Sequence, residues 1–144
     1  MRCFVNDDIT HVSGKVNPLH DIEIIDTELM LADLDTVQKM FQRAERAAKA
    51  NEKAAVARRD GLQKLLTALE NGKPARSVVL DERESAELRD LHLITSKPVM
   101  YVANVAEDSP EENPLAAPVR ELASAQGSEF VAISAALEAE LAQL

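Results

Sequence analysis

The chain has 144 residues, with 16 Lys or Arg against 25 Asp or Glu, and its net charge of −9 disfavours broad binding to phosphate backbones without excluding a local basic patch. Aromatic residues make up 3% of the chain, which argues against a stacking platform for single-stranded nucleic acid, and the single cysteine excludes an intramolecular disulfide or a cysteine-rich zinc site. No apolar run approaches the roughly 18–20 residues of a membrane span, and the N-terminus lacks a signal-peptide pattern, so we expect a soluble, cytoplasmic protein.

The first predicted elements are a short strand and a long helix. Residues 2–5 are typical of the end of a strand, and Asn17-Pro18 closes the loop that follows. From Asp21, which can cap a helix, to Ala50, apolar residues recur at steps of three and four without Gly or Pro, which predicts a helix about 45 Å long. Its predicted buried face consists of Ile22, Ile25, Leu29, Ala32, Thr36 or Val37, Met40, Ala44 and Ala47.

A second helix is predicted to follow the first closely. Residues 51–53 form a polar break, and the next apolar stripe leads to Asn71-Gly72-Lys73-Pro74, a strong signal for the end of a helix. Two long helices joined by a short break form an antiparallel hairpin. The second stripe consists of Ala55, Leu62, Leu65, Leu66 and Leu69.

The rest of the chain alternates between strands and helices. After an extended piece at residues 77–80, Asp81 and Glu84 have the spacing of a capping box and predict a helix through Leu91. Apolar runs at 97–104 and 130–133 predict two strands, each buried on both faces of a parallel sheet, with a helix at 119–125 between them and another from Ser134. This order of strands and helices predicts an α/β fold.

Polar residues follow both of these strands. The first ends in Asn104, with Glu107 three residues later, and the second is followed by Ser134, Ala135 and Ala136. Ligands of open α/β sheets bind outside the carboxyl ends of the strands. In P-loop guanine-nucleotide enzymes the matching sequences are Asn-Lys-x-Asp and Ser-Ala-Lys, where the Asn amide braces the two loops and the acid reads the base edge. The spacing predicts recognition of a purine base, and the alternative is a set of ordinary loop residues.

The acidic residue bears on which purine is bound. Asp accepts two hydrogen bonds from guanine, whereas Glu107 reaches one methylene further and would crowd that base. Adenine presents no such pair of donors, and a buried polar group left unpaired costs about 1–3 kcal/mol. Glu107 therefore favours adenine over guanine, or a loose specificity.

A resemblance to a known family rests on segments spread over essentially all 144 residues, of which the first block is the most specific. These segments are residues 2–4, 6–18, 21–23, 28–29, 31–35, 93–98, 101–108 and 134–140. The chain resembles the YchF-type Obg-like ATPases, whose nucleotide domain is a P-loop NTPase domain. The resemblance implies the C-terminal half of such a parallel sheet, with an inserted antiparallel coiled-coil hairpin.

The resemblance also implies a division of the chain and a set of ligands. It assigns residues 1–20 to a nucleotide-domain strand and its loop, 21–75 to the hairpin, 76–96 to a return segment and 97–144 to the base-binding half. It implies ATP as the cofactor, with GTP weaker and Mg²⁺ in the intact enzyme, and the ribosome or RNA as a partner. Asn104 and Glu107 match the family's Asn-x-x-Glu motif, Val105 is its hydrophobic residue beside the adenine, and residues 134–136 complete the pocket.

The sequence departs from that family by omission. It contains no Gly-x-x-x-x-Gly-Lys-Ser/Thr motif and no Asp-x-x-Gly switch, and the family's TGS domain is missing. We therefore expect a central fragment that does not hydrolyse ATP by itself, and whose open sheet edge at residues 2–5 favours self-association. The rival interpretation is a non-enzymatic helical module for protein interaction.

Three other features admit a functional interpretation. Cys3 lies on a strand, where a buried and unreactive thiol is expected rather than a redox switch. Acidic and histidine residues near the N-terminus lack a recognised metal-ligand spacing, so no metal site is predicted for Asp7, Asp8, His11, His20 and Asp21. Basic residues of the hairpin form either a solvated surface or a contact for RNA or the ribosome; they are Lys39, Arg43, Arg46, Lys49, Lys53, Arg58, Arg59 and Lys64.

Overall fold

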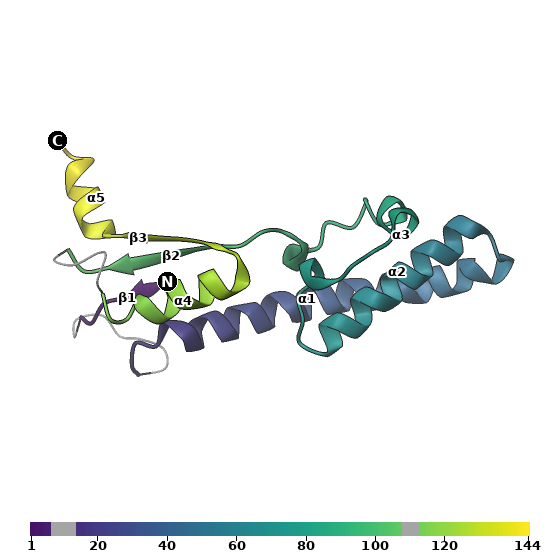
Figure 1. Ribbon diagram of the computed structural model, residues 1–144, viewed down its shortest axis with the longest axis horizontal. Coiled ribbons are helices and arrows are strands. Elements are labelled where there is room, and N and C mark those ends of the chain that lie inside the picture. The colour runs from purple at the N-terminus through teal and green to yellow at the C-terminus, as the bar shows by residue number, and fades with distance from the viewer. Residues whose placement is uncertain (7–13, 108–112) are drawn as a thin grey trace. The chain divides into compact units, whose positions relative to one another are not determined.

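The computed structural model describes residues 1–6, 14–107 and 113–144 (Figure 1). The chain divides into two compact units, which we call the sheet unit (residues 1–24 and 99–144) and the hairpin unit (residues 25–98). The sheet unit combines parallel strands with helices, so the predicted α/β class is confirmed. None of the helices in the described part of the chain is both long and apolar enough to cross a membrane.

The sheet unit is built on three parallel strands in the order β1-β2-β3. Strand β1 (Arg2–Cys3) pairs with β2 (Met100–Val105), which pairs in turn with β3 (Glu129–Ile133). Helix α4 (Ala117–Gln126) connects β2 to β3, and α5 (Ala135–Leu141) follows β3. The predicted strands at residues 2–5, 97–104 and 130–133 thus lie side by side in one parallel sheet. Since all three run in the same direction, their carboxyl ends lie at one edge of the sheet.

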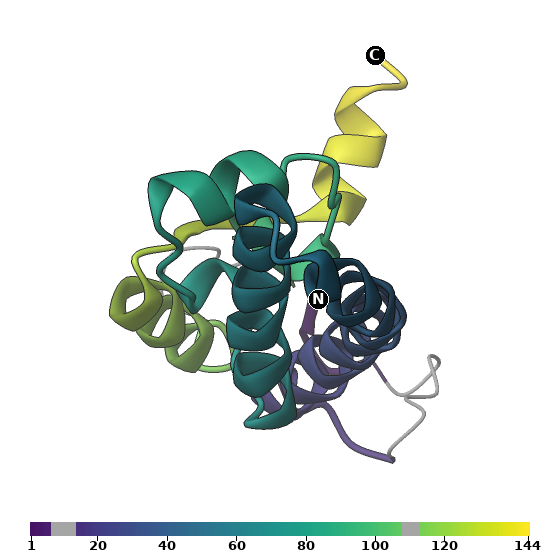
Figure 2. The ribbon, with the colours of Figure 1, turned by 90° about the vertical axis from the view of Figure 1, so that its right-hand side faces the viewer.

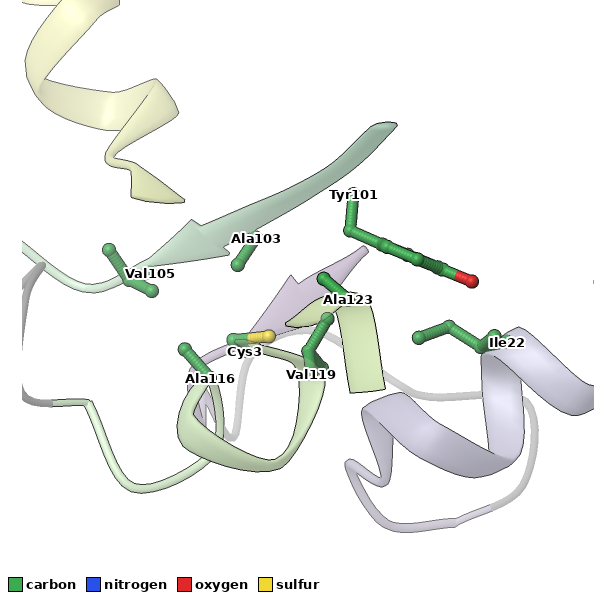
Figure 3. Close-up of a cluster of buried hydrophobic side chains, with 8 residues drawn as sticks. All are labelled: Cys3, Ile22, Tyr101, Ala103, Val105, Ala116, Val119 and Ala123. Atoms are coloured by element: carbon green, nitrogen blue, oxygen red, sulfur yellow. The ribbon is translucent and has the colours of Figure 1, made fainter. Parts of the chain in front are cut away.

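One face of this sheet packs on α4 and on the first turns of the long helix (Figure 3). The buried cluster contains few large side chains, and small residues allow the helix to approach the sheet closely. Its members are Cys3, Ile22, Tyr101, Ala103, Val105, Ala116, Val119 and Ala123.

The prediction of strands buried on both faces is wrong for the described residues. Along β2 burial alternates, with Tyr101 and Ala103 buried while Met100 is 59% exposed. On β3, Val131 is 42% exposed. Both apolar runs are continuous because parallel strands favour such sequences, yet only the face that meets α4 is covered by described elements.

Helix α1 (Pro18–Ala47) begins three residues before the predicted Asp21. The side-chain oxygen of Asn17 accepts a hydrogen bond from the His20 amide at 3.3 Å, and its carbonyl accepts one from the Asp21 amide at 3.1 Å. Asn17 therefore caps the helix and Pro18 occupies its first turn, where proline's missing N–H has no cost. Asn17-Pro18 therefore ends the loop, as predicted, by starting the helix.

The buried face of α1 also differs from the predicted one. Ile22, Val37 and Ala44 are buried as predicted, whereas Ile25 is 53% exposed and Ala32 is exposed too. The same holds for Thr36 and Ala47. The buried line passes instead through a polar residue, Asp33, which is 3% exposed. The periodicity of apolar residues could not predict this part of the buried face, because Asp33 is a carboxylate.

The predicted hairpin is confirmed. After a turn of 3-10 helix, η1 (Ala48–Ala50), Asn51 adopts a left-handed conformation with φ of 57°, and α2 (Lys53–Glu70) begins. The turn at Gly72, with φ of +67°, ends the second helix where predicted. Figure 2 views the hairpin from the end at which α1 and α2 are joined. Leu62, Leu65 and Leu69 of α2 pack in one cluster with Val37 and Ala44 of α1.

The return segment contains short helical turns on either side of a non-helical stretch at residues 78–81, where Val78 and Asp81 have extended backbone angles; the predicted extended piece at 77–80 is therefore confirmed except for residue 77. It contains η2 (Ala75–Ser77), α3 (Glu82–Glu87) and η3 (Ile94–Ser96). The predicted capping box of Asp81 and Glu84 is present, but α3 ends at Glu87, before the predicted Leu91. Gly61 of α2 allows α3 to approach closely, since a Cβ atom there would lie 2.7 Å from Leu88 Cδ1.

A buried carboxylate connects α1 to the return segment. Asp33 accepts hydrogen bonds from the amides of Ile94 and Thr95, at 2.9 and 2.7 Å, and from the Thr95 hydroxyl at 2.6 Å. That hydroxyl oxygen accepts a fourth bond from the Ala75 amide at 2.9 Å. Asp33 thus satisfies the first N–H groups of η3, and residues 33, 75 and 95 join three segments of the hairpin unit.

Removing this carboxylate is expected to destabilise the chain strongly. Asp33→Ala leaves the buried amides of Ile94 and Thr95 without an acceptor, and the expected loss in the free energy of unfolding is about 3 kcal/mol. Chemical denaturation followed by circular dichroism measures it. The matched control is Asp35→Ala, which removes an exposed ion pair with Lys39 and should cost less than about 1 kcal/mol. Equal effects of the two substitutions would contradict the role given to Asp33.

Candidate functional site

A pocket of about 330 Å³ lies at the carboxyl ends of the three strands. Residues that follow β1, β2 and β3 all contribute to it, as the parallel topology requires. The size lies at the lower end of the range for small-molecule sites. The lining residues are Phe4, Val5, Asn6, Asn104, Val105, Ala106, Glu107, Ser134 and Ala136.

The side chain of Asn104 bridges the two loops of the pocket. Its Oδ1 atom accepts a hydrogen bond from the Ala135 amide at 3.0 Å, across 31 positions of sequence. Asn104 lies opposite Ile133 in the ladder of β2 and β3, so its side chain reaches the first residues after β3. The carbonyl side of the amide is thereby occupied, which leaves the Nδ2 donors for a ligand.

Ser134 holds the other loop by capping α5. Its hydroxyl accepts a hydrogen bond from the Leu137 amide at 3.4 Å, and the residue is 8% exposed. The short helix therefore begins directly at the pocket, with Ala136 in the lining and Ala135 tied to Asn104. The structure brings these predicted residues together from two strand ends.

Glu107 gives the pocket its charge. It is exposed, and among the lining residues it is the one with an ionised side chain. A carboxylate acceptor, an amide donor and nearby backbone groups suit a flat polar ring that offers both donors and acceptors. The arrangement is suited to recognition of such a ring.

Val105 occupies a different environment from the one that the resemblance implied. The residue lines the pocket, but it is only 2% exposed and belongs to the core cluster with Cys3 and Ala116. Cys3 is also its partner in the ladder of β1 and β2. Val105 therefore offers little side-chain surface to a ligand, and a lysine at this position would place its stem in the apolar core.

Residues after β1 form a side of the pocket that the sequence analysis did not identify. Phe4, Val5 and Asn6 line it, and the Arg2 guanidinium holds this stretch by donating to the carbonyls of Phe4 and Asn6, at 3.0 and 3.1 Å. The Arg2 guanidinium also lies 4.9 Å from the centre of the Phe4 ring. A signal was available, since the carboxyl ends of parallel strands meet at one edge and residues 4–6 lie at the carboxyl end of the strand predicted at residues 2–5.

The other candidate sites find less support. Asp7, Asp8 and His11 lie outside the described residues, and the described part of the chain holds no group of three or more His, Cys, Asp or Glu placed to bind a metal ion. His20 Nδ1 lies 3.9 Å from a Glu23 carboxylate oxygen, on the surface of α1. Cys3 is fully buried, and burial raises the pKa of its thiol, so it is protonated near neutral pH.

Half of the basic residues predicted for the hairpin surface are held in ion pairs. Arg58 binds both oxygens of Asp90 at 2.8 Å and the carbonyl of Glu87, and its guanidinium lowers the pKa of the Asp90 carboxyl. The Lys64 ammonium lies 2.7 Å from the buried Glu84 carboxylate. The pairs of this kind are Lys39 with Asp35, Arg58 with Asp90, Arg59 with Asp60, and Lys64 with Glu84.

Comparison with known proteins identifies the class. No protein-family model matches the chain. The YchF GTPase structure of Schizosaccharomyces pombe superimposes on 99% of this chain with a TM-score of 0.83 and 27% identity, over 40% of its own length. The parallel sheet and the helical hairpin therefore match the fold of an Obg-like P-loop NTPase.

Curated relatives identify the family. The chain is 49% identical over all 144 residues to the ribosome-binding ATPase YchF of Escherichia coli O157:H7 and 46% identical to that of Bacillus subtilis. It spans 40% of the length of these relatives. The chain therefore corresponds, over its whole length, to one segment of the YchF proteins.

Loss of the bridging amide should loosen the start of α5. Asn104→Ala removes the acceptor of the Ala135 amide, and a neutral hydrogen bond of about 1 kcal/mol corresponds to an approximately fivefold faster hydrogen exchange at that amide. Exchange measured residue by residue by NMR tests this. Glu129→Ala, an exposed change at the other end of the neighbouring strand, serves as the control. Unchanged exchange at Ala135 in the Asn104 variant would show that the bond does not hold the loop.

Proposed function

We propose that this segment supplies the base-binding part of a nucleotide site and a helical arm for the ribosome in a YchF-type ATPase. The observation that carries the first part is the Asn104–Ala135 bond, which joins two loops around a pocket at the carboxyl edge of the sheet. The relatives are named ribosome-binding ATPases, which supports both parts. The proposal is thus made for the complete protein, to which this segment contributes.

In this proposal the base is adenine, and ATP is preferred over GTP. The donors of Asn104 and the loop at residues 134–136 would hold the ring, with Glu107 at its edge and Val105 forming part of the pocket wall from the core. Glu107 is one methylene longer than the Asp that reads guanine, so it would crowd the amine of that base. The printed names of the relatives differ, since the curated ones are called ATPases and the solved structure a GTPase. Base preference therefore needs a direct measurement.

The phosphates and Mg²⁺ require groups outside this segment. Phosphoryl transfer depends on backbone N–H groups and a lysine that cradle the phosphates, and on a held metal ion. The sequence contains no Gly-x-x-x-x-Gly-Lys-Ser/Thr motif that would provide the cradle. ATP would supply the phosphoryl group, and Mg²⁺ would supply positive charge beside it. This chain's own residues would orient the base.

The isolated chain is expected not to hydrolyse ATP. Release of inorganic phosphate from the purified 144-residue chain with ATP and Mg²⁺ should stay at the level of buffer, because no segment supplies the phosphate cradle. A full-length relative assayed in parallel provides the positive control. Turnover that copurifies with the chain, and that is lost in Asn104→Ala, would contradict this expectation.

Shortening the acid at the pocket should move the base preference towards guanine. In a full-length relative that carries this segment in place of its own, Glu107→Asp gives room to guanine and an acceptor at the right distance. A recovered hydrogen bond to a charged group is worth about 1.5–3 kcal/mol, so the ratio of the ATP and GTP affinities should change by about tenfold or more. Competition binding of the two nucleotides measures this ratio.

The control for that experiment is Glu121→Asp, an exposed glutamate on α4 away from the pocket. It should leave the ratio unchanged. If Glu107→Asp also leaves it unchanged, Glu107 does not read the base.

The alternative function is a non-enzymatic helical module for protein interaction, favoured by the length of the hairpin. The two proposals differ in what the pocket binds. Titration of the chain with adenosine, followed by NMR, should perturb the amides of Asn104, Glu107 and Ala135 if the pocket binds a base. Perturbation confined to other residues would favour the interaction module.

A further inference from the structure

The ion pairs of the hairpin leave one group of basic residues without an acidic partner. Arg43, Arg46, Lys49 and Lys53 are exposed, and none of them forms an ion pair with the residues that the structure describes. Among the eight basic residues from position 39 to position 64, the other four are each within 2.8 Å of a carboxylate oxygen. The eight basic residues therefore separate into four that form ion pairs and four that do not, which we call the available set.

The available set gathers at the end of the hairpin where α1 passes into α2. Arg43 and Arg46 lie in the last turns of α1, Lys49 in η1, and Lys53 is the first residue of α2. Residues 43–53 carry a net charge of +2, with Glu45 and Glu52 as the acidic members, in a chain of net charge −9. The sign of the charge at this end is thus opposite to that of the chain.

Helical geometry places these cations on one face. Ala44 and Ala48 are buried against the hairpin core, at 5% and 7% exposure. At about 100° per residue of α-helix, Arg46 lies opposite the line that leads from Ala44 to Ala48, with Arg43 about 60° to one side, and Lys49 follows in η1. Gln42 lies next to Arg46 on this face.

We infer that this face, which we call the hairpin tip, binds the phosphate backbone of ribosomal RNA. Three long cationic side chains in a row, with a fourth across the turn, suit a line of phosphates, and arginine can bind a phosphate with two parallel hydrogen bonds. The face has no aromatic or large aliphatic residue to anchor a protein partner, which favours RNA over a protein surface. This inference rests on the proposed ribosome contact and names its residues.

Sedimentation with purified 70S ribosomes and with protein-free ribosomal RNA, each over a range of salt concentrations, tests the inference on the full chain. Arg43→Gln with Arg46→Gln should weaken binding to both by about tenfold at physiological salt. The variant with all four tip residues changed to Gln should reduce the slope of log affinity against log salt by about 3. Circular dichroism confirms that the exposed changes preserve the helices.

The matched control removes the same charge from the same hairpin. Lys39→Gln with Arg59→Gln also deletes two cations, but these two are already paired with Asp35 and Asp60, so binding should remain within about twofold of the parent. Equal losses of affinity from both pairs of substitutions would show that only net charge matters, and would overturn the inference that the hairpin tip binds RNA. Unchanged binding by the four-residue variant would overturn that inference alone. A parent chain that binds no ribosome would overturn the proposed ribosome contact as well. Binding to ribosomes that is independent of salt, without binding to free RNA, would assign the surface to a ribosomal protein and overturn the RNA contact.

Discussion

A buried carboxylate, Asp33, ties the long helix of the hairpin unit to the return segment. Asp33 accepts three hydrogen bonds from residues 94 and 95, and the hydroxyl oxygen of Thr95 accepts one from the Ala75 amide. These contacts join α1 to two turns that lie about 40 to 60 positions away in sequence. The return segment is otherwise short of regular structure, so its backbone N–H groups need acceptors from elsewhere. The same carboxylate decides which face of α1 turns inward.

The sheet unit uses a similar device at its carboxyl edge. Strand β2 and the start of α5 are connected by the amide of Asn104, whose one side chain fixes two loops at the pocket. The core beneath is made largely of small residues, such as Cys3, Ala103 and Ala123, which allow close packing. Polar contacts therefore set the positions of the loops at the pocket, and the apolar core lies beneath them.

Charge pairing gives the hairpin its surface character. Arg58 and Lys64 both stabilise the contact between α2 and the return segment, through Asp90, Glu87 and the buried Glu84. These basic residues therefore act within the molecule, and a count of lysines and arginines overstates what is offered to a partner. Of the eight basic residues from position 39 to position 64, the four without an ion pair to the described residues lie at the hairpin tip. Ion pairing thus reduces the candidate contact residues of this basic stretch from eight to the four at the hairpin tip.

Local signals in the sequence determined much of this protein. The turn at residues 71–74, the capping box of Asp81 and Glu84, and the polar break after Ala50 were all predictable, because each depends on residues within one turn of chain. The α/β order and the meeting of residues 104 and 134 at one edge also followed, since parallel strands share their carboxyl ends. What the tertiary structure alone decided was burial: the inward face of α1, the covered face of β2 and the enclosure of Val105. Burial depends on which distant segment packs where, and a polar residue such as Asp33 is buried only when distant amides arrive to bind it.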